Sequence, residues 1–229
     1  MNIAEQITQL KQDFDEVKRA GYDKGFIDGQ AQGGGGTCNC TWKDTFKEFL
    51  AYKNGQLVSL FQGSTFETFS FKDYNDTETA KNATNMFTGN KKLKTVTPFN
   101  TSNVTAMGTM FNECDAFTEF KGFDTKKCTI FYRMFNLCIN LKSVEIDFSS
   151  ATNLNETFRR CDVLEDVEIS GMITTPISFA DSPDLTEDSI DNIVEHLGTV
   201  ETATITINSG IDMTAYEDRI RAKGWTLVQ

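Results

Sequence analysis

The side chains that could act as acids, bases or nucleophiles are few or widely separated. The one histidine, His196, lies in a stretch with helical spacing of apolar residues, and no serine or cysteine stands at a suggestive distance from it. A carboxylate group at Asp162, Glu165, Asp166 and Glu168 has the chemistry of an acid–base pair or a cation site. In a chain with 33 acidic residues such a group also arises by chance, so a solvated face is the preferred interpretation.

A repeat organises the middle of the chain. Phe87, Phe111, Phe135 and Phe158 are separated by 24, 24 and 23 residues. Large apolar residues recur six positions later (Leu93, Phe117, Leu141, Leu164) and nine positions later (Val96, Phe120, Val144, Val167). A period in the twenties with apolar positions in register predicts a solenoid.

Most of the cysteines follow this repeat. Cys114, Cys138 and Cys161 each stand three residues after a repeat phenylalanine, and Cys128 falls where Val104 stands one repeat earlier. We therefore expect four small buried apolar side chains and no disulfide framework.

The remaining motifs predict no cofactor either. Cys38 and Cys40 are one residue apart, with no second Cys or His pair nearby, so a plain loop or strand is preferred to a metal site. Gly33 to Gly36 lacks the Lys-Ser/Thr ending of a phosphate-binding loop. We expect no catalytic group, no cofactor and no metal.

Each repeat predicts a strand and a turn. The pattern L-x-x-V-x-I alternates buried and solvated positions, as in a strand with one wet face, and successive strands would stack in parallel about 4.8 Å apart. The other half of the repeat, as in Val104, Met107, Met110 and Phe111, predicts a short helical turn packed behind the sheet. The fold class is α/β, a leucine-rich repeat solenoid with parallel strands.

The outward side chains of these strands form the candidate binding face, because a continuous surface of this kind is where solenoids usually bind. The first predicted row, in repeat order, is Thr68, Thr95, Glu119, Ser143, Asp166 and then Thr204. The second row is Ser70, Thr97, Lys121, Glu145, Glu168 and then Thr206. The rows change from neutral hydroxyls to mostly acidic groups, and the hydroxyl-rich end suits a carbohydrate or a protein loop.

The N-terminal segment predicts an oligomerising helix. Ile3, Ile7, Leu10, Phe14 and Val17 follow a heptad seam that is too short to be stable alone. The seam is followed by G-Y-x-x-G-F-x-x-G, whose glycines indicate close helix approach or a docking groove, or else a fraying helix end. The residues of this motif are Gly21, Tyr22, Gly25, Phe26 and Gly29. An amphipathic helix folded back on its own domain is the alternative.

The predicted organisation has five parts: an attachment helix at 1–32, a glycine-rich linker at 33–40, an N-terminal cap at 41–60, leucine-rich repeats at 61–178 and a C-terminal cap at 179–229. In the C-terminal cap, Thr186 to Leu197 and Ile211 to Ala222 have helical patterns, and Ala203 to Ile207 alternates as a strand.

Composition restricts the partners. The net charge of −11 argues against nucleic acid, whose binders concentrate Lys and Arg on one face. The first residues match no signal peptide and the sequence has no apolar run long enough to span a bilayer, so we expect neither export nor membrane insertion.

The repeat resembles a known family. F-x-x-C-x-x-L-x-x-V-x-I, preceded by stretches such as Phe99 to Thr105, is similar to the BspA-like leucine-rich repeat family, in its variant with F-D-T-S-N-V-T-x-M-x-x-M-F repeats. The resemblance covers Phe61 to about Leu185, and it departs at Asn90, which stands at a Cys position, and in the glycine-aromatic segment. The layout also resembles leucine-rich repeat proteins of bacteriophages, which have a helix like Leu10 to Val17 and a terminal Gly-Trp-Thr-Leu like Gly224 to Leu227.

This resemblance implies a virion structural protein, a fibre or receptor-binding component on the virion surface. The N-terminal helix would join other virion proteins as a homo-oligomer, a trimer by analogy with fibres, and the repeats would contact a host-surface protein or carbohydrate. A bacterial leucine-rich repeat adhesin or interaction module is the first alternative. An enzyme acting on glycans through the acidic rows is the second.

Overall fold

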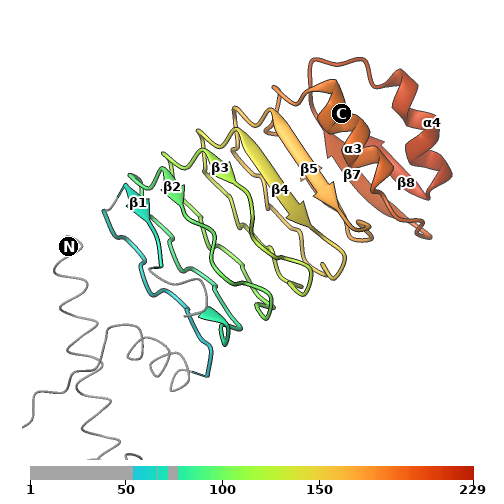
Figure 1. Ribbon diagram of the computed structural model, residues 1–229. Helices are drawn as coiled ribbons and strands as arrows, with labels where there is room; N and C mark the ends of the chain where they lie inside the picture. Colours follow the sequence, from blue (N-terminus) through green and yellow to red (C-terminus); the bar gives the residue numbers. More distant parts are fainter. Residues whose placement is uncertain (1–53, 66, 72–76) are drawn as a thin grey trace, which may run out of the picture.

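The structure is a computed structural model that describes residues 54–65, 67–71 and 77–229. It is a mixed α/β protein with short parallel strands, and the helices of the described part lie together near the C-terminal end (Figure 1). The elements in chain order are β1 (Thr68–Phe69), β2 (Thr95–Val96), β3 (Glu119–Phe120), β4 (Ser143–Asp147), β5 (Asp166–Ser170), β6 (Ile177–Phe179), α3 (Glu187–Glu195), β7 (Ala203–Ile207), α4 (Thr214–Ala222) and β8 (Trp225–Val228).

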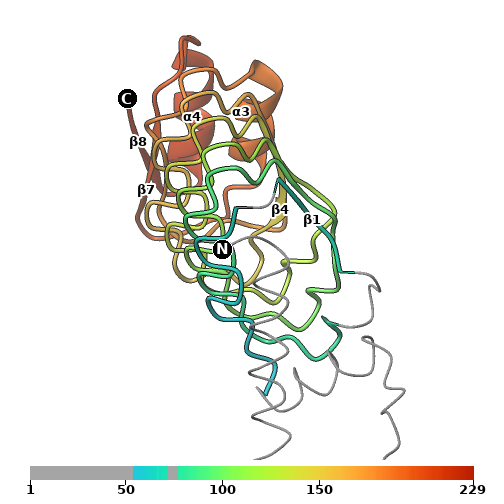
Figure 2. The same ribbon diagram turned by 90° about the vertical axis from the view of Figure 1, so that its left-hand side faces the viewer.

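Strands β1 to β5 occupy the same half of successive repeats. β1 pairs with β2, and β3, β4 and β5 form a second sheet, with all pairs parallel. Val144 pairs in register with Phe120 and Val167, one repeat away on each side, and its side chain is buried. The parallel strands predicted from the alternating pattern are therefore confirmed, and viewed along the stack the repeats overlie one another (Figure 2).

The other half of each repeat differs from the helical turn predicted for it. Met107 N–H and Phe111 N–H donate to the carbonyls of Ile130 and Met134 in the next repeat, at 2.9 Å each. Isolated parallel bridges extend this ladder through Gln56, Asn82, Ala106, Ile130 and Asn153. The prediction was wrong because these N–H groups pair between repeats, whereas an α-helix needs them for bonds to carbonyls four residues earlier.

The ladder depends on a recurrent left-handed backbone. In each of two successive repeats, the residues two before and two after the phenylalanine have positive φ: 55° at Thr109 and 59° at Glu113, then 51° at Arg133 and 63° at Leu137. Tight turns at these sites direct successive carbonyls toward the neighbouring repeat. The conformation is uncommon for residues with a Cβ, so the ladder bonds and the packing beneath them must hold it in place.

A column of phenylalanines fills the centre of the stack. Neighbouring rings lie nearly parallel, with centroids 5.4 Å apart between Phe87 and Phe111, 5.9 Å between Phe111 and Phe135, and 5.7 Å between Phe135 and Phe158. All four of these side chains are fully buried. The repeat phenylalanines thus bury apolar area and stack at distances typical of offset aromatic pairs.

The C-terminal part closes the stack with different elements. The helix predicted over 186–197 is confirmed as α3, and Thr186 caps its N-terminus by accepting a bond from Ser189 N–H. The predicted strand is β7, which pairs with β6 and β8. The helix predicted over 211–222 begins later, at Thr214, because the Asp212 carboxylate accepts bonds from Thr214 N and Oγ1 in a turn before it.

Candidate binding surface

We define the strand face as the outward side chains of β1 to β5 and of the residues that continue their alternation. Thr68 lies in register with Thr95, Glu119 with Ser143, and Glu145 with Glu168. Most of these side chains are exposed, whereas the alternate residues Val144, Ile146, Val167 and Ile169 are buried. Exposed residues in register are Thr68 with Thr95, and Glu145 with Glu168, while Ser70, Thr97 and Lys121 are exposed just beyond the paired residues of β1, β2 and β3.

One predicted member of this face is not available to a ligand. Ser143 is only 8% exposed. Its register partners are Glu119 and Asp166, one on each side, and their longer side chains flank the short hydroxyl. Ser143 is therefore not part of the exposed row that the alternation pattern predicted.

The rows also end earlier than predicted. Thr204 and Thr206 lie on β7, and β7 pairs with β6, not with β5. Figure 2 places β7 and β8 on the other side of the coil from β1 and β4. The prediction that Thr204 and Thr206 continue the rows of Asp166 and Glu168 was therefore wrong.

Helix α3 takes the position beside β5 that a further strand would occupy. Val167 N–H donates to Ser189 Oγ at 2.9 Å, and Ile169 N–H donates to Asn192 Oδ1 at 2.7 Å. Helix side chains thus satisfy the edge of the sheet in place of strand carbonyls. Periodicity predicted the helix but not its place, because that place depends on side-chain bonds to a strand about 20 residues earlier.

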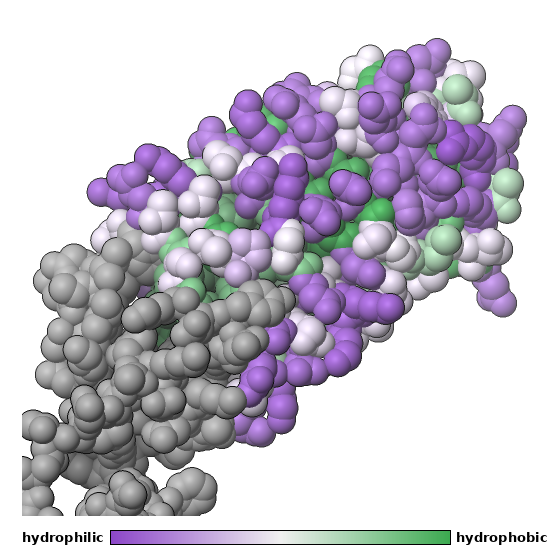
Figure 3. Space-filling view, in the orientation of Figure 1, coloured by the Kyte–Doolittle hydropathy of each residue, from purple (hydrophilic) through white to green (hydrophobic). Residues whose placement is uncertain are grey.

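The charge of the strand face varies along the stack. Near its start, Lys94 Nζ lies 2.8 Å from Glu67 Oε2 and lowers the pKa of that carboxyl through a hydrogen bond and its charge. Further along, Glu145 and Glu168 are register partners, beside Asp166 on the same strand. Neighbouring like charges favour a cationic or strongly hydrogen-bonding partner at this end. Figure 3 shows the mostly hydrophilic surface, with a smaller hydrophobic area near β5.

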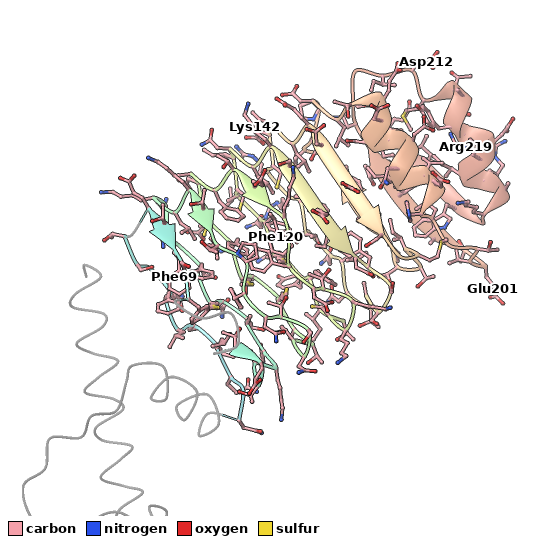
Figure 4. All side chains as sticks on the ribbon, in the orientation of Figure 1. Phe69, Phe120, Lys142, Glu201, Asp212 and Arg219 are labelled. Carbon is pink, nitrogen blue, oxygen red and sulfur yellow. The ribbon has the colours of Figure 1, made fainter. Side chains whose placement is uncertain are left out.

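Figure 4 shows where labelled side chains of the repeat stack and of the C-terminal end lie on the ribbon. Phe69 on β1 and Phe120 on β3 lie two levels apart within the stack, and Lys142 lies at the upper end of β4. Lys142 Nζ is 3.8 Å from Glu165 Oε1. Glu201, Asp212 and Arg219 belong to the separate C-terminal end. These three charged residues therefore lie away from strands β1 to β4.

The repeat cysteines are buried, as expected, and they have an additional role. The thiols of Cys114, Cys138 and Cys161 donate to the carbonyls of phenylalanines one repeat earlier, at 3.2, 3.0 and 3.3 Å. Burial raises the pKa of Cys114 to about 12, and it raises the pKa of Cys138 and Cys161 as well. These groups stay protonated at neutral pH and connect repeats, so they are poor nucleophiles.

Among the described residues, Cys128 lies outside the phenylalanine pattern and is buried in the same way. Burial raises the pKa of Cys128 to about 12, and its thiol donates to Ile130 O at 3.4 Å. His196 lies at the C-terminal end of α3, where its Nδ1 is 2.8 Å from Asn192 O. Both groups have local structural partners.

The sequence did not identify the surface opposite the strands. We define the turn face as the outward side chains of the bridge-forming halves of the repeats. Arg133 Nε and Nη2 donate to the two oxygens of Glu156 at 2.8 and 3.2 Å, and Arg159 Nη1 lies 3.3 Å from Glu156 Oε2. These hydrogen bonds and charges lower the pKa of Glu156. Arg133 and Glu156 stand two residues before Phe135 and Phe158, and Arg159 stands one residue after Phe158, so alignment of the last two repeats would have placed these charges near one another.

Several predicted features lie outside the described residues. These are the heptad residues Ile3, Ile7, Leu10, Phe14 and Val17, the motif from Gly21 to Gly29, the linker with Cys38 and Cys40, and residues 41–53 of the N-terminal cap. In the described part of the chain, no cluster of three or more His, Cys, Asp or Glu residues is arranged to hold a metal ion. Nor does any helix there have the length and apolar character needed to cross a membrane.

Comparison with known proteins provides one match. Neither the curated proteins nor the solved structures include a significant match to the chain. A family model described as "Mycoplasma protein of unknown function, DUF285" matches residues 56–181, which is more than half of the chain and covers β1 to β6. By this match over its repeats, the chain belongs to the DUF285 family.

Proposed function

We propose that the described repeats form a leucine-rich repeat solenoid that acts as a binding module without catalysis, with the strand face toward its partner. The observation that carries the proposal is the exposure of polar side chains in register on paired strands, Thr68 with Thr95 in one sheet and Glu145 with Glu168 in the next. A contiguous surface of this kind can contact an extended partner at many points. The buried, protonated thiols support binding over nucleophilic chemistry.

Charge reversal on the strand face tests this proposal. The double substitution Glu145→Lys with Glu168→Lys should abolish binding of the labelled protein to bacterial cells that the unmodified protein binds, measured by flow cytometry. Glu201→Lys with Asp218→Lys makes the same change in charge at the exposed C-terminal end and should leave binding intact. Equal loss in both variants would indicate a non-specific effect of charge, and unchanged binding in both would exclude the strand face.

In its more specific form, the proposal is a bacteriophage virion component, a fibre or receptor-binding protein. The N-terminal segment would associate as a trimer and join other virion proteins, while the repeats face a host-surface protein or carbohydrate. The support is the resemblance of Leu10 to Val17 and of Gly224 to Leu227 to phage leucine-rich repeat proteins. Replacing Ile7 and Leu10 by Asp should convert a trimeric mass to a monomeric one in light scattering, and a monomeric unmodified chain would reject the oligomer.

The second candidate is a cellular adhesin or interaction module. The family match favours it, because the description of that family refers to a Mycoplasma protein. Gene neighbourhood distinguishes the two candidates: flanking tail or capsid genes support the virion component, and flanking surface-protein genes support the adhesin. Both keep the strand face as the binding surface.

A further inference from the structure

The turn face contains a step between two repeats. Parallel bridges align Ala106 with Ile130, and the ladder bond from Thr109 N–H to Tyr132 O places Tyr132 beside Gly108. Ile130 is 40% exposed, and a Cβ added at Gly108 would lie 3.5 Å from Ile130 Cγ2. The apolar and aromatic side chains of one repeat therefore stand beside the two small residues of the previous repeat.

Next to this step, charged groups are held in a fixed arrangement. The guanidinium carbon of Arg133 lies 5.0 Å from the centroid of the Tyr132 ring, and the same guanidinium is bidentate to Glu156. Glu156 also pairs with Arg159. Two guanidinium groups around one carboxylate leave a local positive charge in a chain whose net charge is −11. The arrangement favours an anionic ligand.

Arg159 is the group most open to such a ligand. Its side chain is 54% exposed. Of its three guanidinium nitrogens, Nη1 bonds to Glu156, and the other two have no bond to a side chain among the described residues. The Nε and Nη2 edge remains available for a carboxylate, which guanidinium groups bind through two parallel hydrogen bonds. The bonds that Glu156 makes reduce the freedom of this arginine before any ligand arrives.

The backbone of the turn face favours a sugar over a peptide. Met107, Thr109 and Arg133 use their N–H groups in ladder bonds between repeats. An extended peptide would find these donors occupied. Side chains remain for recognition: the part of the half-buried Tyr132 ring that Arg133 does not cover, and the exposed amides of Asn153 and Asn155. A ring face with nearby amide groups suits the apolar face and hydroxyls of a pyranose.

We propose that this turn-face patch, formed by Ile130, Tyr132, Arg133, Asn155 and Arg159, binds an acidic carbohydrate. The pyranose ring packs against Tyr132 and Ile130, and its carboxylate is held by Arg159. The patch lies on the opposite side of the coil from the strand face, so it adds a second site to the function proposed above. Failure of this site would leave the strand-face proposal unaffected.

Calorimetric titration of the full chain with a tetramer of galacturonic acid, and with a neutral galactose tetramer, tests the patch. We expect the acidic tetramer to bind and the neutral one to bind at least about tenfold more weakly. Arg159→Gln and Tyr132→Ala should each weaken binding of the acidic tetramer by about tenfold. Arg221→Gln is the matched control, because Arg221 is an exposed arginine paired with Asp218 on α4, and it should change the affinity less than twofold.

Three results would overturn the proposal. The first is absence of binding by the acidic tetramer to the unmodified chain. The second is an equal loss of affinity in Arg221→Gln and Arg159→Gln, which would indicate attraction by charge alone. The third is tighter binding of a polyglutamate peptide than of the acidic tetramer, with the same dependence on Arg159, which would assign the patch to an acidic protein segment. Unchanged thermal unfolding of the variants establishes that any loss is local.

Discussion

The repeats and the C-terminal end extend the protein by different means. Each repeat pairs its backbone with the backbone of the next, as Phe111 N–H does with Met134 O. On the strand face, backbone pairing ends at β5, where the side chains of Ser189 and Asn192 on α3 meet the strand. On the other side, β6, β7 and β8 continue to pair through the backbone. Backbone pairing can be repeated with almost any outward side chain, whereas closing the stack requires particular residues.

The same difference appears in the two cores. In the repeats, one residue type recurs at one position, and Phe87, Phe111 and Phe135 stack at nearly constant spacing. In the C-terminal end, the contacts are individual: Trp225 Nε1 donates to Gly198 O at 2.7 Å, and Lys223 Nζ donates to Val194 O at 3.0 Å at the end of α3. The comparison predicts that substitutions in the repeats lower stability in proportion to the buried contact they remove. In the C-terminal end, the loss of stability should depend on the particular residue that is replaced.

The largest expected effect is loss of a ring from the middle of the stack. Phe135→Ala should lower the free energy of unfolding by about 3–5 kcal/mol, because it removes stacking on Phe111 and Phe158 and leaves a cavity. Urea unfolding measures the change. Ile139→Ala, four residues away at a 37% exposed side chain, should cost less than about 1 kcal/mol. Equal losses would show that the phenylalanine column is not the main source of stability.

The next effect belongs to the C-terminal end. Gly224 has a φ of +84°, and a Cβ added there would lie 2.0 Å from Val200 O. Gly224→Ala should therefore destabilise the protein by roughly 2–4 kcal/mol through strain and a backbone clash. Gly210→Ala is the control, since nothing lies within 4 Å of its added Cβ. Calorimetric melting of both variants would reveal whether only the first lowers the unfolding temperature.

A smaller loss is expected where α3 meets β5. Ser189→Ala leaves the buried N–H of Val167 without its hydroxyl acceptor, and it should cost about 1–3 kcal/mol. Hydrogen exchange should show faster exchange at Val167 N–H, and Glu195→Ala on the exposed face of α3 should not change it. Unchanged protection of Val167 in Ser189→Ala would mean that helix packing alone covers the strand.

One substitution should add the thiol-to-carbonyl hydrogen bond of the repeats at the start of the C-terminal end. Ser182 stands three residues after Phe179, where the repeats have cysteine, and its buried hydroxyl has no partner among the described residues. In Ser182→Cys, the thiol should reach Phe158 O as Cys161 reaches Phe135 O. We expect about 0.5–1 kcal/mol of stabilisation in urea unfolding. A gain of the same size in Ser182→Ala would attribute the effect to removal of the hydroxyl.

The smallest effect concerns the turn face and pH. Arg133 holds the pKa of Glu156 below its ordinary value of 4.5. Because the folded pKa is below the unfolded one, the ion pair stabilises the protein above about pH 4.5 and loses this contribution as the pH falls through the lowered pKa. Glu156→Gln should slightly lower the melting temperature at pH 7 and reduce its dependence on pH below 4.5. An unaltered pH profile would show that the pair adds no stability.

Much of the repeat stack could be predicted from residue spacing. Phenylalanine positions, the alternation around Val144 and the burial of Cys138 each follow from a local pattern that recurs. The candidate face was only partly predictable. The alternation places Ser143 on the outward side, but its side chain is buried between register partners that belong to other repeats. The charges of Arg133 and Arg159 could not be placed from the sequence, because their half of the repeat was predicted to be a helical turn and forms a ladder between repeats instead.

By itself, the sequence determined the repeat length, the inward residues and the helical character of α3. These properties follow from short-range periodicity, since burial on one side of a repeated backbone requires apolar residues at fixed intervals. The tertiary structure decided that the turns form an interstrand ladder, that α3 replaces a strand beside β5, and that β7 lies on the turn face. Those outcomes depend on hydrogen bonds between residues about 20 or more positions apart, such as Met107 with Ile130 and Val167 with Ser189, and no local pattern specifies them.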